Sequence, residues 1–155
     1  MDIQKPYAGA FVGDTHHFAL RVYIEDTDLG GVVYHSNYLC FLERARSDML
    51  RCVGIDQRQA IETGRGVYAV AEAHLKYLRP ARLDDELLIR TRLTELRAAS
   101  CAIQQQILRH DQTLTEASVI VAFLGPDGRP RRHPAEWAKK FRGIITPGEP
   151  SSTQR

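Results

Sequence analysis

The chain has 155 residues, of which 43% are hydrophobic and 26% charged, a composition typical of one soluble globular domain with a sizeable core. Its formal net charge of +2 is too small to indicate a nucleic acid or a membrane surface as a partner. The three cysteines, Cys40, Cys52 and Cys101, form no CxxC pair, so they indicate core packing in a reducing compartment rather than a disulfide framework. We find no signal peptide and no apolar run of the roughly 20 residues that span a bilayer, and we therefore expect a cytoplasmic protein without a transmembrane segment.

The N-terminal part is expected to contain an arm, one strand and a turn. Residues 1–17 show no hydrophobic periodicity, which indicates a flexible arm. Leu20–Glu25 alternates between apolar and polar residues and predicts the first strand. The sequence Asp28-Leu29-Gly30-Gly31 then has the composition of a turn.

One long amphipathic helix is predicted from about Ser36 to Val53. Its apolar residues recur at three- and four-residue spacing, which places them in one stripe along the helix. Ser36 or Asn37 is expected to cap the start of the helix, and Gly54 is expected to end it in the left-handed conformation.

Alternating apolar residues predict four more strands, and their short connections indicate antiparallel neighbours. The faces expected to be buried in these strands run over residues 67–77, 87–93, 101–107 and 117–123. Pro134 is expected to open a last short helix over residues 135–141, and the tail over residues 144–155 is expected to be disordered. One long helix beside five strands predicts an α+β domain over residues 18–143.

Asp28 is the candidate catalytic residue. A reactive carboxylate needs a fixed position near an electrophile and a group that stabilises the charge developing there, and the start of a helix offers free backbone N–H groups. Asp28 precedes the predicted helix start by seven to nine residues, with Gly30 and Gly31 between them, so it can lie opposite the N–H groups of His35 and Ser36. From spacing alone a role in the turn or as a helix cap stays open for Asp28. Asp26 is expected to be structural.

Two segments resemble a known family. "RVYIEDTDLGGVVYHSNYLCFLERAR", Arg21–Arg46, and "YLRPARLDDELLIRT", Tyr77–Thr91, are similar to the hotdog-fold acyl-CoA thioesterases of the 4-hydroxybenzoyl-CoA thioesterase family. Within that family the resemblance is closest to the YbgC-type enzymes that are associated with the Tol-Pal system. The similarity extends from about Arg21 to Phe141.

The resemblance implies a hotdog fold, in which a curved five-stranded antiparallel sheet wraps the long helix. It also implies a homodimer or homotetramer with active sites at the dimer interface. The family's catalytic carboxylate falls on Asp28, and its carbonyl-polarising backbone N–H falls on His35, while Tyr34 and Asn37 match the segment that forms the substrate pocket. The implied reaction is hydrolysis of an acyl thioester, with Asp28 either as the nucleophile or as the base that activates water.

Coenzyme A carries phosphates, so basic residues near the site are of interest. Relatives acting on aromatic thioesters carry a basic cluster where this chain has residues 96–100, and only Arg97 and Ser100 fit it, since Ala98 and Ala99 occupy basic positions. This departure indicates either another way of holding coenzyme A or an acyl-carrier-protein substrate. The basic run over residues 129–133 is expected to be a solvated turn.

We expect no metal and no cofactor apart from the coenzyme A of the substrate. The histidines that might suggest a metal, His16, His17 and His35, have no cysteine or carboxylate at ligand spacing. A non-catalytic module that binds acyl-CoA or acyl carrier protein is the alternative function, and Asp28 favours the enzyme. A hotdog dehydratase fits less well, since it needs a catalytic histidine together with an acid. The length of the acyl group does not follow from the residues.

Overall fold

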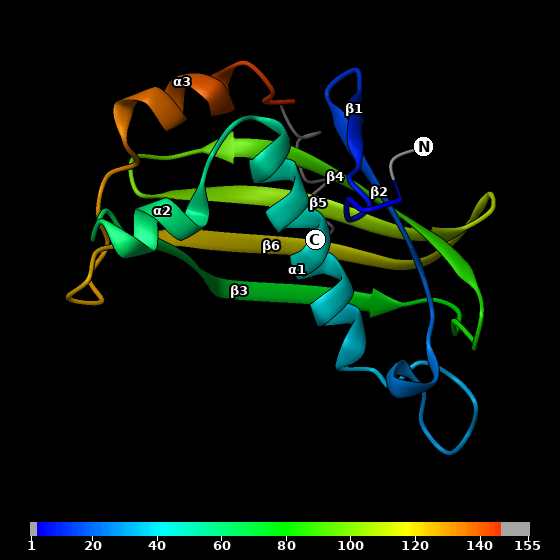
Figure 1. The fold of residues 1–155 in the computed structure, drawn as a ribbon. Helices are drawn as coiled ribbons and strands as arrows, with labels where there is room; N and C mark the ends of the chain where they lie inside the picture. The colour runs from blue at the N-terminus through cyan, green and yellow to red at the C-terminus, as the bar shows by residue number, and fades with distance from the viewer. Residues whose placement is uncertain (1–2, 147–155) are drawn as a thin grey trace, which may run out of the picture.

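The structure, a computed structural model, describes residues 3–146. Six strands form one antiparallel sheet in the order β1-β2-β4-β5-β6-β3, and the long helix α1 lies across one face of it (Figure 1). The strands are β1 (Ala10–Val12), β2 (Thr15–Arg21), β3 (Val67–Tyr77), β4 (Glu86–Leu96), β5 (Ser100–Arg109) and β6 (Gln112–Leu124). The helices are a 3-10 helix (Ile24–Asp26), α1 (Asn37–Cys52), α2 (Gln57–Glu62) and α3 (Ala135–Arg142). The α+β class is therefore confirmed, with six strands in place of the expected five.

Helix α1 and the sheet bury each other's apolar faces. The stripe of α1 is buried as expected at Tyr38, Phe41, Leu42, Ala45 and Met49. The sheet contributes alternate residues of β4, β5 and β6, and these are the faces predicted from the period-2 pattern of those strands. Each fully buried apolar side chain of this size contributes about 1.5–3 kcal/mol, so this contact determines where α1 lies.

The expected flexible arm over residues 1–17 is wrong for its second half. Residues 10–17 form β1 and the start of β2, which pair with each other and, through β2, with β4. His16 caused the error, because a histidine reads as polar, whereas its ring is buried at 0% exposure and bonds to Asp48.

The first strand also ends earlier than expected. It stops at Arg21, and Ile24–Asp26 is a 3-10 turn, in which the carboxylate of Asp26 accepts a hydrogen bond from the N–H of Tyr23. Val22 is buried as the alternation predicts, whereas Ile24 is exposed.

Strand β3 is an edge strand whose expected apolar face is not buried in the single chain. A bulge between Val70 and Glu72 interrupts its alternation, and Val67, Val70 and Tyr77 remain exposed. Because β6 pairs with only one side of β3, the other side presents unpaired backbone groups. Figure 1 shows that the N-terminal end of α1 projects past this edge.

The remaining predicted boundaries divide into confirmed and missed ones. Gly54 has a φ of +82° and ends α1 as expected, and α3 begins after Pro134 with Trp137 and Phe141 buried. The short helix α2 was missed, although the side chain of Asp56 caps it by accepting from the N–H of Gln59.

The expected disordered tail is wrong for its first residues. Ile144 and Ile145 pack against the core, and the N–H of Thr146 donates to the carbonyl of Leu93. The rest of the expected tail, residues 147–155, lies outside the described residues, as do residues 1–2 of the expected arm. Within residues 3–146, no helix is long and apolar enough to cross a membrane.

Gly66 offers a test of the packing at the start of β3. It has a φ of +142°, and a Cβ there would lie 2.4 Å from the carbonyl oxygen of Leu124 and 2.7 Å from the ring of Phe123. We expect Gly66→Ala to lower the free energy of unfolding by about 2 kcal/mol or more, because strain and steric overlap add. Gly128→Ala is the matched control, since its φ is also positive, at +77°, but its Cβ meets no atom within 4 Å, and it should cost only about 1 kcal/mol. If urea denaturation showed the same loss of unfolding free energy in both variants, the close packing around Gly66 would be contradicted.

Candidate active site

The loop over residues 26–36 forms a small hairpin of its own before α1. Thr27 and Val33 form an isolated antiparallel bridge, and the N–H of Asp28 donates to the carbonyl of Val32 at 2.9 Å. Gly31 turns the chain with a φ of +77°, and its N–H donates to the carbonyl of Asp28. The backbone of Asp28 is thereby held on both sides of the turn.

The side chain of Asp28 is exposed and makes one hydrogen bond. Its Oδ1 accepts from the N–H of Gly30 at 2.8 Å, so the turn role left open by the sequence is present. The same bond orients the carboxylate, and within residues 3–146 its Oδ2 has no hydrogen-bond partner. Asp28 can therefore stabilise the turn with Oδ1 while Oδ2 stays accessible to a substrate.

Asp26 is structural in this chain. It is 8% exposed, and its Oδ2 accepts from the N–H of Tyr23 at 2.8 Å. Its carbonyl oxygen accepts from the N–H of Tyr34 and from Nδ2 of Asn37, at 2.9 and 2.8 Å. Asn37, a predicted pocket residue, therefore binds the loop backbone with its side chain, and this contact ties the loop to the first residue of α1.

The start of α1 leaves two backbone donors free beside this loop. The N–H of Asn37 donates to the carbonyl of Tyr34, which makes His35 and Ser36 the central residues of a tight turn. In the described part of the chain the N–H groups of His35 and Ser36 have no hydrogen-bond partner. The side chain of Ser36 makes no capping bond, contrary to one of our expectations. Such free donors at a helix start favour a negative charge.

Tyr77 of strand β3 contacts the start of α1 and fixes its position. The hydroxyl of Tyr77 donates to the carbonyl of His35 at 3.0 Å, and the ring of Tyr38 packs edge-on against that of Tyr77 at 5.3 Å. The exposed ring of Tyr34 lies 4.4 Å from that of His35. Tyr34, His35 and Asp28 therefore lie on one loop whose base is attached to the sheet.

The second sequence motif completes this attachment. The N–H of Val33 donates to the carbonyl of Ala81, and Val32 bridges to Arg82. The N–H of Ala81 in turn donates to the hydroxyl of Tyr38, whose pKa is raised by burial. The two motifs, far apart in the sequence, are thus joined by hydrogen bonds, which is a physical reason for their occurring together.

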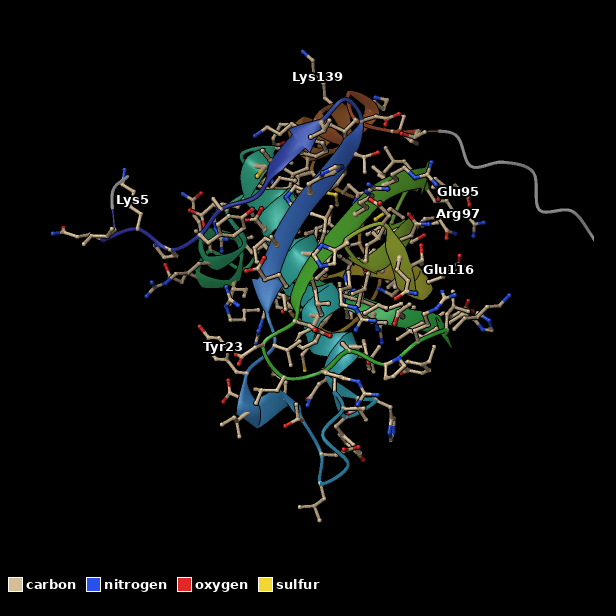
Figure 2. All side chains as sticks on the ribbon, turned by 90° about the vertical axis from the view of Figure 1, so that its right-hand side faces the viewer. Lys5, Tyr23, Glu95, Arg97, Glu116 and Lys139 are labelled. Carbon is tan, nitrogen blue, oxygen red and sulfur yellow. The ribbon has the colours of Figure 1, made fainter. Side chains whose placement is uncertain are left out.

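Arg97 and Ser100 do not lie with these residues in the single chain. Arg97 lies in the β4–β5 turn and Ser100 is the first residue of β5, at the end of the sheet opposite the Asp28 loop, and Figure 2 shows Arg97 beside Glu95 and away from that loop. The guanidinium of Arg97 bonds to Glu95 at 2.8 Å, and both side chains are exposed. The carbonyl of Ser100 faces Nε2 of His133 at 3.1 Å.

A cavity of about 110 Å³ lies between α1 and the sheet, near the β4–β5 turn. Its walls include Arg46 and Ser47 of α1, Tyr68 and Val70 of β3 and Cys101 of β5, and neither Asp28 nor His35 lines it. Burial lowers the pKa of Arg46 and raises that of Cys101 to about 12.

Two polar residues that line this cavity, Arg46 and Tyr68, have buried partners outside the lining that were not identified from the sequence. Nη1 of Arg46 donates to Oε1 of Gln105, whose Nε2 donates to the carbonyl of Leu42 and to Oγ1 of Thr91. One signal was present in the sequence, since Gln105 interrupts the apolar face of its strand. The hydroxyl of Tyr68 similarly lies 2.8 Å from Nδ1 of the buried His133.

The basic run over residues 129–133 is partly structural. Nη1 of Arg131 donates to the carbonyl oxygens of Gly64 and Arg65, and His133 is buried, whereas Arg129 and Arg132 are exposed. The solvated turn expected there is therefore wrong for the buried His133, whereas Arg129, Arg131 and Arg132 are exposed as expected.

Most of the chain is similar to known thioesterases. Residues 22–142 match the model of a family described as the thioesterase-like superfamily. The chain is 42% identical over 125 residues to the acyl-CoA thioester hydrolase YbgC of Escherichia coli O6:H1, a match that covers 79% of this chain and 92% of that protein. It is 40% identical over 105 residues to the acyl-CoA thioesterase YbgC of Haemophilus influenzae, covering 68% of this chain and 77% of that protein.

A solved structure gives the same result for the fold. The probable thioesterase from Bartonella henselae superimposes with a TM-score of 0.74 at 38% sequence identity, over 77% of this chain and 99% of that one.

Proposed function

Because the chain belongs to the thioesterase-like superfamily, and within it to the YbgC-type hotdog thioesterases, we propose that it hydrolyses acyl-CoA to a free acid and coenzyme A. The protein is a thioesterase with the hotdog fold. The relatives from E. coli and H. influenzae are named for acyl-CoA, and this supports acyl-CoA as the substrate class here. An acyl group on acyl carrier protein is a second candidate substrate with the same thioester bond.

The observation that carries the proposal is the pairing of a free carboxylate oxygen with a free N–H on one anchored loop. Oδ2 of Asp28 and the N–H of His35 have no hydrogen-bond partner within residues 3–146, whereas Oδ1 of Asp28 and the carbonyl of His35 both accept one. We place the thioester carbonyl between these two groups. The carbonyl oxygen then accepts from the His35 N–H, and the carbonyl carbon faces the Asp28 carboxylate.

The reaction follows from this placement. Oδ2 of Asp28 attacks the carbonyl carbon, the oxyanion is stabilised by the His35 N–H and the positive end of α1, and the carbon–sulfur bond breaks to release the coenzyme A thiolate. Water then hydrolyses the resulting anhydride and regenerates Asp28. In the alternative route Asp28 takes a proton from a water that attacks directly. Both routes use the same two groups.

A second copy of the chain completes the site in our proposal. The free edge of β3 carries the exposed Val67, Val70 and Tyr77, and it offers unpaired backbone groups to an identical strand. A twofold axis near the middle of β3, at Glu72, pairs the two strands antiparallel and places Tyr77 of one copy opposite Val67 of the other.

This pairing brings together groups that lie apart in one chain. Tyr77 holds His35, so the Asp28 loop of one copy comes to the end of the partner at which β3 begins. The 110 Å³ cavity, Arg97 and Ser100 all lie at that end. We propose that the acyl group enters the partner's cavity and that Arg97 and Ser100 lie on the side of the coenzyme A phosphates.

Asp28→Asn tests the reactive carboxylate. The amide keeps the acceptor that bonds to Gly30 but is neither a nucleophile nor a base, so kcat for release of coenzyme A should fall by about 10²–10⁴-fold with the melting temperature unchanged. The matched control is Asp26→Asn, two residues away, which keeps its acceptor for Tyr23 and should retain most of the turnover. The assay follows free thiol over short, long and aromatic acyl-CoAs. Near-normal turnover in Asp28→Asn would refute the role, and no release from any substrate by the wild type would favour a binding module.

Mixed dimers test the composite site. Cys101→Phe places a phenyl ring in the 110 Å³ cavity, and this variant and Asp28→Asn should each be inactive alone. In a mixed dimer one of the two sites combines an intact Asp28 with an open cavity, so random mixing should restore about one quarter of the wild-type activity. If each site used the Asp28 and the cavity of the same chain, mixing would restore nothing.

A further inference from the structure

A second cluster of reactive side chains lies at the opposite end of α1 from the Asp28 loop. His16 of β2 meets Asp48 and Cys52 of α1 there. Along α1, Asn37 and Cys52 are separated by about 22 Å at 1.5 Å per residue, so this cluster does not belong to the proposed active site. His17 and His35, the other histidines considered for metal binding in the sequence, are not part of it.

The three donor atoms all lie within 4.8 Å of one another. Nε2 of His16 lies 2.7 Å from Oδ2 of Asp48, and Sγ of Cys52 lies 3.5 Å from the same oxygen and 3.8 Å from Nε2 of His16. His16 is 0% and Asp48 is 3% exposed, whereas Cys52 is exposed. The cluster is therefore closed on the protein side and open to solvent on the side of the thiol.

The spacing of these atoms matches that of ligands around one metal ion. Bond lengths of about 2.0–2.1 Å to nitrogen and oxygen and 2.3 Å to sulfur place tetrahedral ligands about 3.4–3.6 Å apart. The two distances from sulfur already lie near this range, and only the His16–Asp48 pair must open, by about 0.7 Å. Asp48 and Cys52 are one helical turn apart on one face of α1, a spacing that metal sites on helices also use.

The backbone of the N-terminal segment is shaped around the cluster. The N–H of Gly9 donates to Oδ2 of Asp48 at 3.0 Å, and its carbonyl faces Sγ of Cys52 at 3.5 Å. A Cβ on Gly9 would overlap the carbonyl oxygen of His17 and would also lie 2.8 Å from Oδ2 of Asp48 and 3.1 Å from Nε2 of His16. Gly9 therefore lets the chain close over the three donors without a side chain between them.

We propose that His16, Asp48 and Cys52 bind one divalent transition-metal ion, with Zn²⁺ the best match to the donor set. One imidazole, one carboxylate and one thiolate are all zinc ligands, and the mixture with a soft sulfur disfavours Mg²⁺ and Ca²⁺. The open side of the cluster leaves the fourth position to water. The bound ion would join residues 9–16 to the end of α1, so it stabilises the folded protein by mass action.

Cobalt(II) is the probe for this site, because its thiolate complexes absorb in the near ultraviolet and its tetrahedral complexes absorb in the visible. Untagged, chelator-treated protein should bind one equivalent of Co²⁺ with both bands, and Zn²⁺ should displace it and raise the melting temperature. Cys52→Ser should lose the near-ultraviolet band and bind Zn²⁺ more than about 10-fold more weakly, because even the loss of an outer-shell partner costs that much.

Cys40→Ser is the matched control, since Cys40 is an exposed cysteine of the same helix that is not part of the cluster. It should bind both ions like the wild type, and Zn²⁺ should protect Cys52 but not Cys40 from alkylation. The proposal is overturned if the thiolate band is missing, if Cys52→Ser and Cys40→Ser bind alike, or if no stoichiometric binding occurs. In those cases the cluster is a hydrogen-bonded anchor for Gly9. None of these readouts depends on thioesterase activity.

Discussion

The structure depends on the burial of one face of α1 against the sheet. The apolar stripe of α1 from Tyr38 to Met49 is buried, and it packs against the buried faces of β4, β5 and β6. Once the helix lies across the sheet in this way, its first turn projects past β3 (Figure 1). The free donors of a helix start are therefore placed at an edge of the protein rather than inside it, which is where a second copy and a substrate can reach them.

The two aspartates of the loop before α1 have different environments. Asp26 is buried and uses its carboxylate and its carbonyl to hold the loop closed onto Tyr23, Tyr34 and Asn37. Asp28 is held by its backbone and by one carboxylate oxygen, and its other oxygen has no hydrogen-bond partner within residues 3–146. In the single chain this oxygen faces solvent. Covering it with a second copy would remove water and strengthen the interaction of the oxyanion with the His35 N–H.

The sequence predicted the parts of this protein that rest on local patterns. The period of apolar residues predicted α1 and strands β4, β5 and β6, because their buried faces are continuous and the helix is long. It failed at β2, where His16 is buried through a bond to Asp48 that lies 32 residues away. The pattern also failed at β3. Its apolar residues are exposed, because no described part of the same chain packs over them. For the site, Asp28 and His35 were predicted from the family resemblance, whereas the cavity and the His16–Asp48–Cys52 cluster arise from tertiary contacts that no local pattern encodes.

The most direct test of the account replaces the backbone donor at His35 and leaves the fold intact. His35 and Ser36 are the central residues of a turn closed by the N–H of Asn37, and proline is favoured at the first of these positions, where the N–H of His35 has no structural partner. We predict that His35→Ala keeps most of its turnover of acyl-CoA, since it keeps the N–H. His35→Pro should lose about 10²–10³-fold in kcat with an unchanged melting temperature. Equal turnover in the alanine and proline variants would contradict the account.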